Sequence, residues 1–154
     1  MDVFSRALEA HAVTVWRVAL HNAPTRADAE DVTQEVFEKL LSCRKEFTDD
    51  EHLKAWLIRV TINQCRSLRR SFGRERVPLT PELAAPTDEG DAVLEAVRGL
   101  PAKFRNAIYL HYYEGYSAEE VGGIMGANRN TVLSWLSRGR ALLKKQMIGG
   151  FDDE

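Results

Sequence analysis

The sequence is poor in cysteine. Its two cysteines, Cys43 and Cys65, lie outside any Cys-x-x-Cys spacing and have no companion histidine pair at zinc-ligand intervals. We therefore expect neither a disulfide framework nor a structural metal site. Both residues are expected to be reduced thiols.

Long apolar runs are also missing. No stretch approaches the roughly 18 uninterrupted apolar residues of a membrane-spanning helix. The N-terminal segment contains Asp2, Arg6, Glu9 and His11, where a secretory signal peptide has an apolar run. We therefore predict a cytoplasmic protein with no membrane insertion.

An excess of charge of either sign is missing too. The chain has 154 residues, with 21 Lys and Arg against 23 Asp and Glu, so its net charge is −2. This balance excludes a globally basic nucleic-acid coat, so any contact with nucleic acid must come from local segregation of charge. A hydrophobic content of 44% excludes a disordered tail and allows a core for one ordinary domain or two small ones.

Residues suited to catalysis are scattered. His11, His21, His52 and His111 show no recognisable nucleophile or acid–base spacing to Ser, Cys or carboxylate residues. The sequence also lacks a glycine-rich phosphate loop. It therefore predicts neither an enzyme active site nor a bound cofactor.

Helical periodicity dominates the chain, and the strand signal is poor. We predict a helix over about 3–21, a second after Pro24 and Thr25, and a third from Glu51 or His52 to about Ser71. The apolar side of the second is marked by Val32, Val36, Phe37, Leu40 and Leu41. These patterns predict an all-α fold.

The composition changes between residues 77 and 91. Three prolines and a glycine occur there with four acidic residues, and the helical period disappears. From residue 92 we predict a short helix ending at Gly99, a helix from Pro101 to about Glu114, and two more. The predicted organisation is two small helical domains, residues 1–76 and 92–148, joined by a flexible acidic linker over 77–91.

Charge is segregated within the first predicted domain. Residues 28–51 hold nine acids against three bases, whereas residues 59–76 hold six arginines against Glu75. On a helical wheel a polar stripe forms, with Trp56 at its border; its members are Arg59, Asn63, Arg66 and Arg70. Such a stripe can follow a phosphate backbone while the indole stacks on an unpaired base. The alternative is a solvated basic face with Trp56 in the core.

A helix-turn-helix pattern occupies the second predicted domain. Ser117 and Glu120 form a capping box for a short helix that Gly126 ends, and Asn128 can cap another helix two residues later. That last helix has a predicted buried seam of Val132, Leu136, Gly139 and Leu143 and an exposed side of Asn130, Ser134, Ser137, Arg138 and Lys145.

The exposed side of that helix suits a reader of the DNA major groove. Short polar side chains come first, cations follow, and no acid occurs over residues 121–148. The alternative is an ordinary helical hairpin with a basic surface.

Several segments resemble the sigma-70 family of bacterial RNA polymerase sigma factors. Residues 28–37 (DAEDVTQEVF) resemble its polymerase-binding segment, and residues 55–63 (AWLIRVTIN) its promoter-melting helix. Leu100-Pro101, residues 112–117 (YYEGYS) and residues 131–140 (TVLSWLSRGR) resemble its C-terminal helix-turn-helix domain. The presence of only the second and fourth sigma regions is similar to the extracytoplasmic-function group.

The resemblance implies a transcription initiation factor without catalytic chemistry, which directs core polymerase to promoters and their melting. Its implied partners are the β′ and β subunits, promoter DNA as duplex and melted strand, and an anti-sigma factor. The polymerase would be bound by Asp31, Gln34, Glu35 and Glu38. The loop from Arg44 to His52 would hold a base flipped from the minus-ten strand.

The resemblance also assigns DNA contacts. Those with the minus-ten element are Phe47, Asp50, His52, Trp56, Arg59, Asn63, Arg66 and Arg70, and those with the minus-thirty-five element are Asn128, Arg129, Asn130, Thr131, Ser134, Ser137, Arg138 and Lys145. The chain departs from the family at Ser67, where Asp is frequent, and at Leu133 or Trp135, where a base is frequent. Trp135 lies on the flank of the wheel, so a core position and a DNA contact both stay open.

Two other functions are compatible with the composition. A stand-alone helix-turn-helix regulator would have the second domain but no need for the acidic docking segment. An all-α hydrolase or small-ligand enzyme would need a convergent acid–base set, which the sequence lacks.

Overall fold

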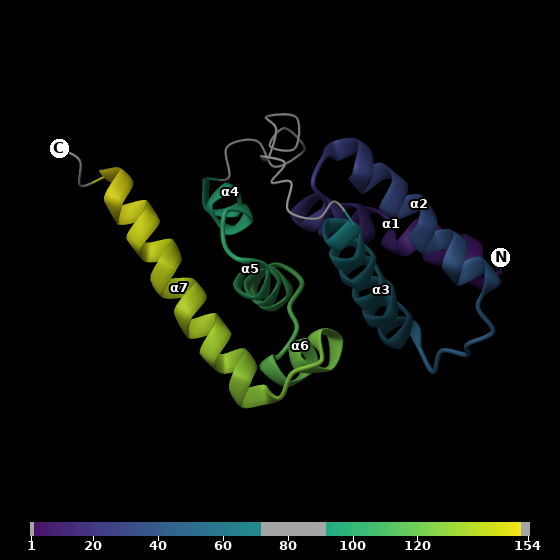
Figure 1. The fold of residues 1–154 in the computed structure, drawn as a ribbon. Coiled ribbons are helices and arrows are strands. Elements are labelled where there is room, and N and C mark those ends of the chain that lie inside the picture. The colour runs from purple at the N-terminus through teal and green to yellow at the C-terminus, as the bar shows by residue number, and fades with distance from the viewer. Residues whose placement is uncertain (1, 72–91, 152–154) are drawn as a thin grey trace. The chain divides into compact units, whose positions relative to one another are not determined.

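The computed structural model describes residues 2–71 and 92–151, without the side chains of residues 3, 70, 71 and 148–151 (Figure 1). The predicted linker over 77–91 lies outside the described residues. All regular structure in the described residues is helical, so the predicted all-α fold is confirmed. The chain divides into two compact units, Met1–Ala85 and Pro86–Glu154.

The first unit is built from three helices that all contact one another. They are α1 (Val3–Asn22), α2 (Arg26–Ser42) and α3 (Asp50–Ser71). Thr25 is the N-cap of α2, and its Oγ accepts a hydrogen bond from Asp28 N at 3.1 Å. The predicted break at Pro24 and Thr25 is therefore confirmed.

Apolar side chains from all three helices meet in the core of this unit. Val15 and Ala19 of α1, Val36 of α2 and Leu57 of α3 are almost completely buried there. The predicted apolar side of α2 is correct except at Leu41, which is 66% exposed. Leu41 follows Leu40 by one position, which rotates it about 100° away from the core.

The second unit is organised around its last helix. Helix α7 (Arg129–Phe151) contacts α4 (Ala92–Arg98), α5 (Ala102–Ile108) and α6 (Ala118–Met125). The predicted seam is buried at Val132, Leu136 and Gly139 and half-buried at Leu143. A Cβ added to Gly139 would lie 2.9 Å from Ile108 Cδ1, so the missing side chain allows α5 and α7 to approach closely.

Two details of the predicted helix over 101–114 were wrong. Pro101 is the N-cap of α5 and precedes its first helical residue. The last turn is a π-helix, η1 (Tyr109–Tyr113), in which Glu114 N donates to Tyr109 O at 3.2 Å. An apolar pattern with a period near four is compatible with both helix types, so it does not reveal the wider turn.

The helix-turn-helix turn has the predicted caps. Ser117 Oγ accepts from Glu120 N at 3.1 Å, and Glu120 Oε1 accepts from Ser117 N at 2.9 Å. Gly126 ends α6 with φ of 75°, a left-handed conformation that favours glycine. Asn128 Oδ1 then accepts from Thr131 N at 2.8 Å and caps α7.

Gly122 is a further requirement of this turn. A Cβ at Gly122 would overlap Ala127 O, a backbone atom that cannot move without distorting the turn. The neighbouring Gly123 is exposed, and a Cβ there would have nothing within 4 Å. The two glycines therefore have opposite steric surroundings in one helix.

Gly122→Ala is expected to lower the free energy of unfolding by about 1–3 kcal/mol, because the added methyl group overpacks the turn. Gly123→Ala is the matched control. It is expected to raise stability by up to roughly 1 kcal/mol, since alanine is the better helix former at an open site. Urea denaturation of the full chain followed by circular dichroism measures both, and equal effects of the two substitutions would contradict the steric argument.

Candidate functional site

An acidic face runs along the solvent side of α2. The side chains of Asp31, Gln34, Glu35 and Glu38 are all exposed, while Val32 on the same helix is buried. The helix therefore separates its core-forming side from a polar side that is free to contact another molecule.

Gln64 of α3 connects to this acidic face. Its Nε2 donates to Glu35 Oε2 at 2.7 Å, and its Oε1 accepts from Lys39 Nζ at 2.7 Å. Gln34 Nε2 lies 3.5 Å from Glu38 Oε2 one turn further along. Sequence reasoning missed Gln64. Its partners Glu35 and Lys39 lie 29 and 25 positions away along the chain, and contacts at such separations produce no local pattern.

An apolar groove of about 510 Å³ borders the acidic face between α1 and α2. Phe4, Leu8 and Trp16 of α1 line it, and Gln34 and Glu38 of the acidic face line its α2 side. Arg26 holds its guanidinium 5.7 Å from the centre of the Trp16 ring. The acidic face is thus continuous with an apolar surface.

The loop between α2 and α3 carries an aromatic cluster. The Phe47 ring is half-buried, with its centroid 5.2 Å from the ring of His52 and 5.5 Å from that of Trp56. Thr48 N donates to His52 Nδ1 at 3.1 Å, and His52 N donates to Asp49 Oδ1 at 2.8 Å. These contacts join the loop to the first turns of α3.

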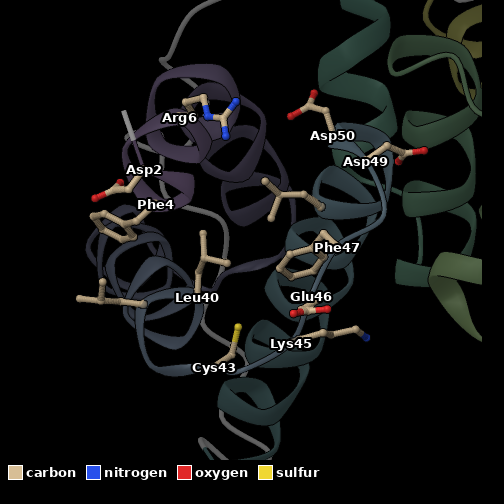
Figure 2. Close-up of a pocket in the computed structure, with 12 residues that line it drawn as sticks. Asp2, Phe4, Arg6, Leu40, Cys43, Lys45, Glu46, Phe47, Asp49 and Asp50 are labelled. Carbon is tan, nitrogen blue, oxygen red and sulfur yellow. The ribbon is translucent and has the colours of Figure 1, made fainter.

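A pocket of about 830 Å³ lies between this loop, the end of α2 and the start of α1. In Figure 2, Phe4 and Leu40 lie on one side of it and Phe47 on the other. Charged side chains also line it: Asp2, Arg6, Lys45, Glu46, Asp49 and Asp50. The pocket therefore combines apolar surface with hydrogen-bonding groups of both signs.

Asp2 is an ionised member of this set. Its Oδ1 accepts a hydrogen bond from Ser5 N at 2.7 Å, which caps α1. That backbone hydrogen bond holds the pKa of the Asp2 carboxyl below its usual value.

The polar stripe of α3 is exposed at Arg59, Asn63 and Arg66, whereas the Arg70 side chain lies outside the described residues. Arg69 has a different role, since its Nε donates to Asn22 O at the end of α1, at 2.7 Å. Trp56 is half-buried against the core and touches Phe47. The indole therefore has both a packing contact and an exposed part.

The predicted DNA-facing side of α7 is open to solvent. Thr131 is half-buried, and the other predicted contacts are exposed: Asn128, Arg129, Asn130, Ser134, Ser137, Arg138 and Lys145. Trp135 is half-buried on the flank of the helix. Tyr112 is an unpredicted neighbour of α7; it is 53% exposed, and its Oη accepts from Arg140 Nη1 at 3.0 Å.

The described helices show two further features. None is long and apolar enough to cross a bilayer. Within residues 2–71 and 92–151, no three or more His, Cys, Asp or Glu side chains gather in a way that could hold a metal ion.

Comparison with known proteins identifies the family. Residues 7–75 match the model of sigma-70 region 2, and residues 90–143 match that of sigma-70 region 4. The extracytoplasmic-function (ECF) RNA polymerase sigma factor SigL of Mycobacterium tuberculosis is 33% identical over 139 residues, which cover 82% of this chain and 78% of that protein. The chain belongs to the ECF group of the sigma-70 family.

Other sigma factors have related sequences and structures. SigE of Mycolicibacterium smegmatis is 31% identical over 94% of this chain, and the probable sigma factor RfaY of Xanthomonas campestris is 26% identical over 98%. This chain spans 61% and 42% of the length of those two relatives. The sigma factor RpoE of Bartonella quintana, solved with the anti-sigma factor NepR, has a TM-score of 0.76 at 26% identity and full coverage of both chains.

A second solved relative is CnrH in complex with the cytosolic domain of CnrY. It has a TM-score of 0.72 at 25% identity, over 95% of this chain and 88% of that one. In ECF terms, the first unit of the chain carries region 2 and the second carries region 4.

Proposed function

We propose that this ECF sigma factor binds core RNA polymerase and directs it to promoters, where it recognises the minus-thirty-five element and helps to melt the minus-ten element. The observation that carries the proposal is the pairing, on one short chain, of a region 2 unit and a region 4 unit in which most of the described contact residues are solvent-exposed. The protein acts in the cytoplasm, where its polymerase works, and carries out no catalytic step itself.

The acidic face of α2 is the proposed docking surface for the β′ subunit. Its carboxylates are held at the surface by a rigid helix, and Gln64 fixes the rotamer of Glu35 from the neighbouring helix. Preorganised charges lose little conformational entropy on binding and raise specificity for a complementary basic partner. The β subunit is the proposed partner of region 4.

The pocket beneath the α2–α3 loop is the proposed site for a base flipped from the minus-ten strand. The aromatic ring of Phe47 allows stacking on a base, and the charged side chains that line the pocket offer both donors and acceptors to base edges. The exposed stripe of Arg59, Asn63 and Arg66 follows the same strand through its phosphates.

We also propose an anti-sigma factor as a partner. RpoE of Bartonella quintana was solved in a complex with one, which supports the same mode of regulation here. A stand-alone helix-turn-helix regulator is not favoured, because residues 7–75 match sigma-70 region 2. Co-purification with core polymerase tests the proposed partner.

Docking is tested by Asp31→Arg and Gln34→Ala. Both residues are exposed, so the helical fold is expected to persist while affinity for core polymerase falls roughly tenfold. Asp31→Arg reverses a charge of the acidic face, and Gln34→Ala removes an uncharged hydrogen-bonding group from it. Glu9→Arg, an equal change of charge at an exposed position of α1, is the control and is expected to compete normally for core polymerase. Normal competition by both α2 variants would exclude this docking surface.

Strand opening is tested by the double substitution Asn63→Ala and Arg66→Ala. It is expected to leave closed-complex formation intact but to impair melting, since phosphate and base contacts to the exposed strand are lost. Arg17→Ala, at another exposed arginine of the first unit, is the control. A normal permanganate footprint of the bubble in the double variant would contradict the assignment.

Base reading is tested by comparing Asn130→Ala with Arg138→Ala. Asn130 lies near the start of α7, where its side chain can reach base edges. Its loss is expected to change which minus-thirty-five sequence is preferred, with a loss of about 1–3 kcal/mol of discrimination between bases per base contact. Arg138 lies two turns further on. Its loss is expected to weaken all promoters alike and to reduce the salt slope by about one unit.

A promoter-library selection over a range of salt concentrations measures both effects. The two variants serve as controls for each other, because both truncate exposed side chains of one helix. A wild-type preference in Asn130→Ala together with an altered preference in Arg138→Ala would overturn this placement of α7 on DNA.

A further inference from the structure

His11 makes a long-range contact beneath the α2–α3 loop. It lies in the middle of α1 and is only 5% exposed, and its Nε2 lies 2.9 Å from Asp50 Oδ1, 39 positions along the chain. An ionised carboxylate can only accept, so Nε2 carries the proton of this hydrogen bond. The Asp50 side chain is 68% exposed, which leaves the carboxylate accessible from solvent.

Asp50 occupies a junction between the loop and α3. It is the first residue of α3, and it follows Asp49, which caps that helix through His52 N. His52 in turn accepts from Thr48 N and contacts the Phe47 ring. The contact with His11 therefore ties this whole connected segment to α1.

The same segment forms one wall of the pocket described above. Phe47, Asp49 and Asp50 all line that pocket, whereas His11 does not. His11 therefore contacts a residue that lines the pocket without lining the pocket itself.

The hydrogen bond has more effect on orientation than on stability. A bond to a largely exposed carboxylate is weakened by competition with water, so it adds little to the free energy of unfolding. It does, however, select one orientation of the Asp50 carboxylate. A carboxylate held in one orientation can accept from the amino group of a particular base, whereas a freely rotating one discriminates less.

We propose that His11 is a positioning residue for minus-ten recognition: its buried imidazole orients Asp50 and holds the segment Phe47–His52 in the shape that receives the flipped base. This inference rests on the proposed function. It adds a residue of α1, outside every predicted contact, to the determinants of promoter choice.

The test uses the full-length protein with core polymerase and a promoter library randomised at the minus-ten element. His11→Leu fills the buried space without a donor, and His11→Gln keeps a donor at the position of Nε2. His11→Leu is expected to retain core binding and minus-thirty-five preference but to flatten minus-ten discrimination by about three- to tenfold, the effect of losing one charge-assisted hydrogen bond. His11→Gln is expected to restore most of that discrimination.

A double-mutant cycle with Asp50→Ala gives a second readout. If His11 acts through Asp50, the combined variant is expected to discriminate no less than Asp50→Ala alone. Additive losses would overturn the proposal, as would unchanged minus-ten discrimination in His11→Leu.

Thermal melting separates positioning from a purely structural role. The proposal would also be overturned if His11→Leu lowered the melting temperature and reduced transcription equally at all promoters, and if His11→Gln did not restore either. Wild-type protein that directs no promoter-specific transcription would overturn the proposed function as well, whereas wild-type activity with unaltered discrimination in His11→Leu overturns this inference alone.

Discussion

Burial of the apolar side of α3 against α1 and α2 is the contact on which the first unit depends. Leu53, Leu57 and Cys65 of α3 are buried in the shared core. Because rotation of α3 about its axis would expose these side chains, the packing determines which side of the helix faces solvent. The same packing therefore determines that Arg59 and Asn63 are exposed. A change in this packing would move the polar stripe as well as weaken the core.

The second unit uses close backbone approach in the same way. Gly139 lets α7 lie against Ile108 of α5, and Gly122 lets the turn after α6 fold back on that helix. Both contacts restrict the angle at which α7 leaves the turn, and so the direction in which Asn130 and Ser134 point. Glycine here contributes through the absence of a side chain rather than through flexibility alone.

Core packing determines which side of each helix is exposed, and hydrogen bonds between helices then orient individual side chains on those exposed sides. Gln64 links α3 to Glu35 and Lys39 of α2, and His11 links α1 to Asp50. Neither Gln64 nor His11 is a predicted contact residue. Gln64 nevertheless hydrogen-bonds to the predicted polymerase contact Glu35, and His11 to the predicted minus-ten contact Asp50. In this protein the surfaces proposed to bind polymerase and promoter are therefore supported by side chains from neighbouring helices.

Local chemistry was sufficient to predict the all-α fold, the capping box of Ser117, the end of α6 at Gly126 and the buried seam of α7, because periodicity and capping depend on residues within a few positions of one another. The polar stripe of α3 and the DNA-facing side of α7 were predicted from helical wheels, whereas the polymerase contacts and the base-binding loop came from family resemblance. All of these contacts stay predictions. The exposure of Leu41, the π-turn before Glu114 and the links made by Gln64 and His11 were decided only in three dimensions. Each depends on how helices pack, and packing brings together residues whose separation along the chain leaves no repeating signal.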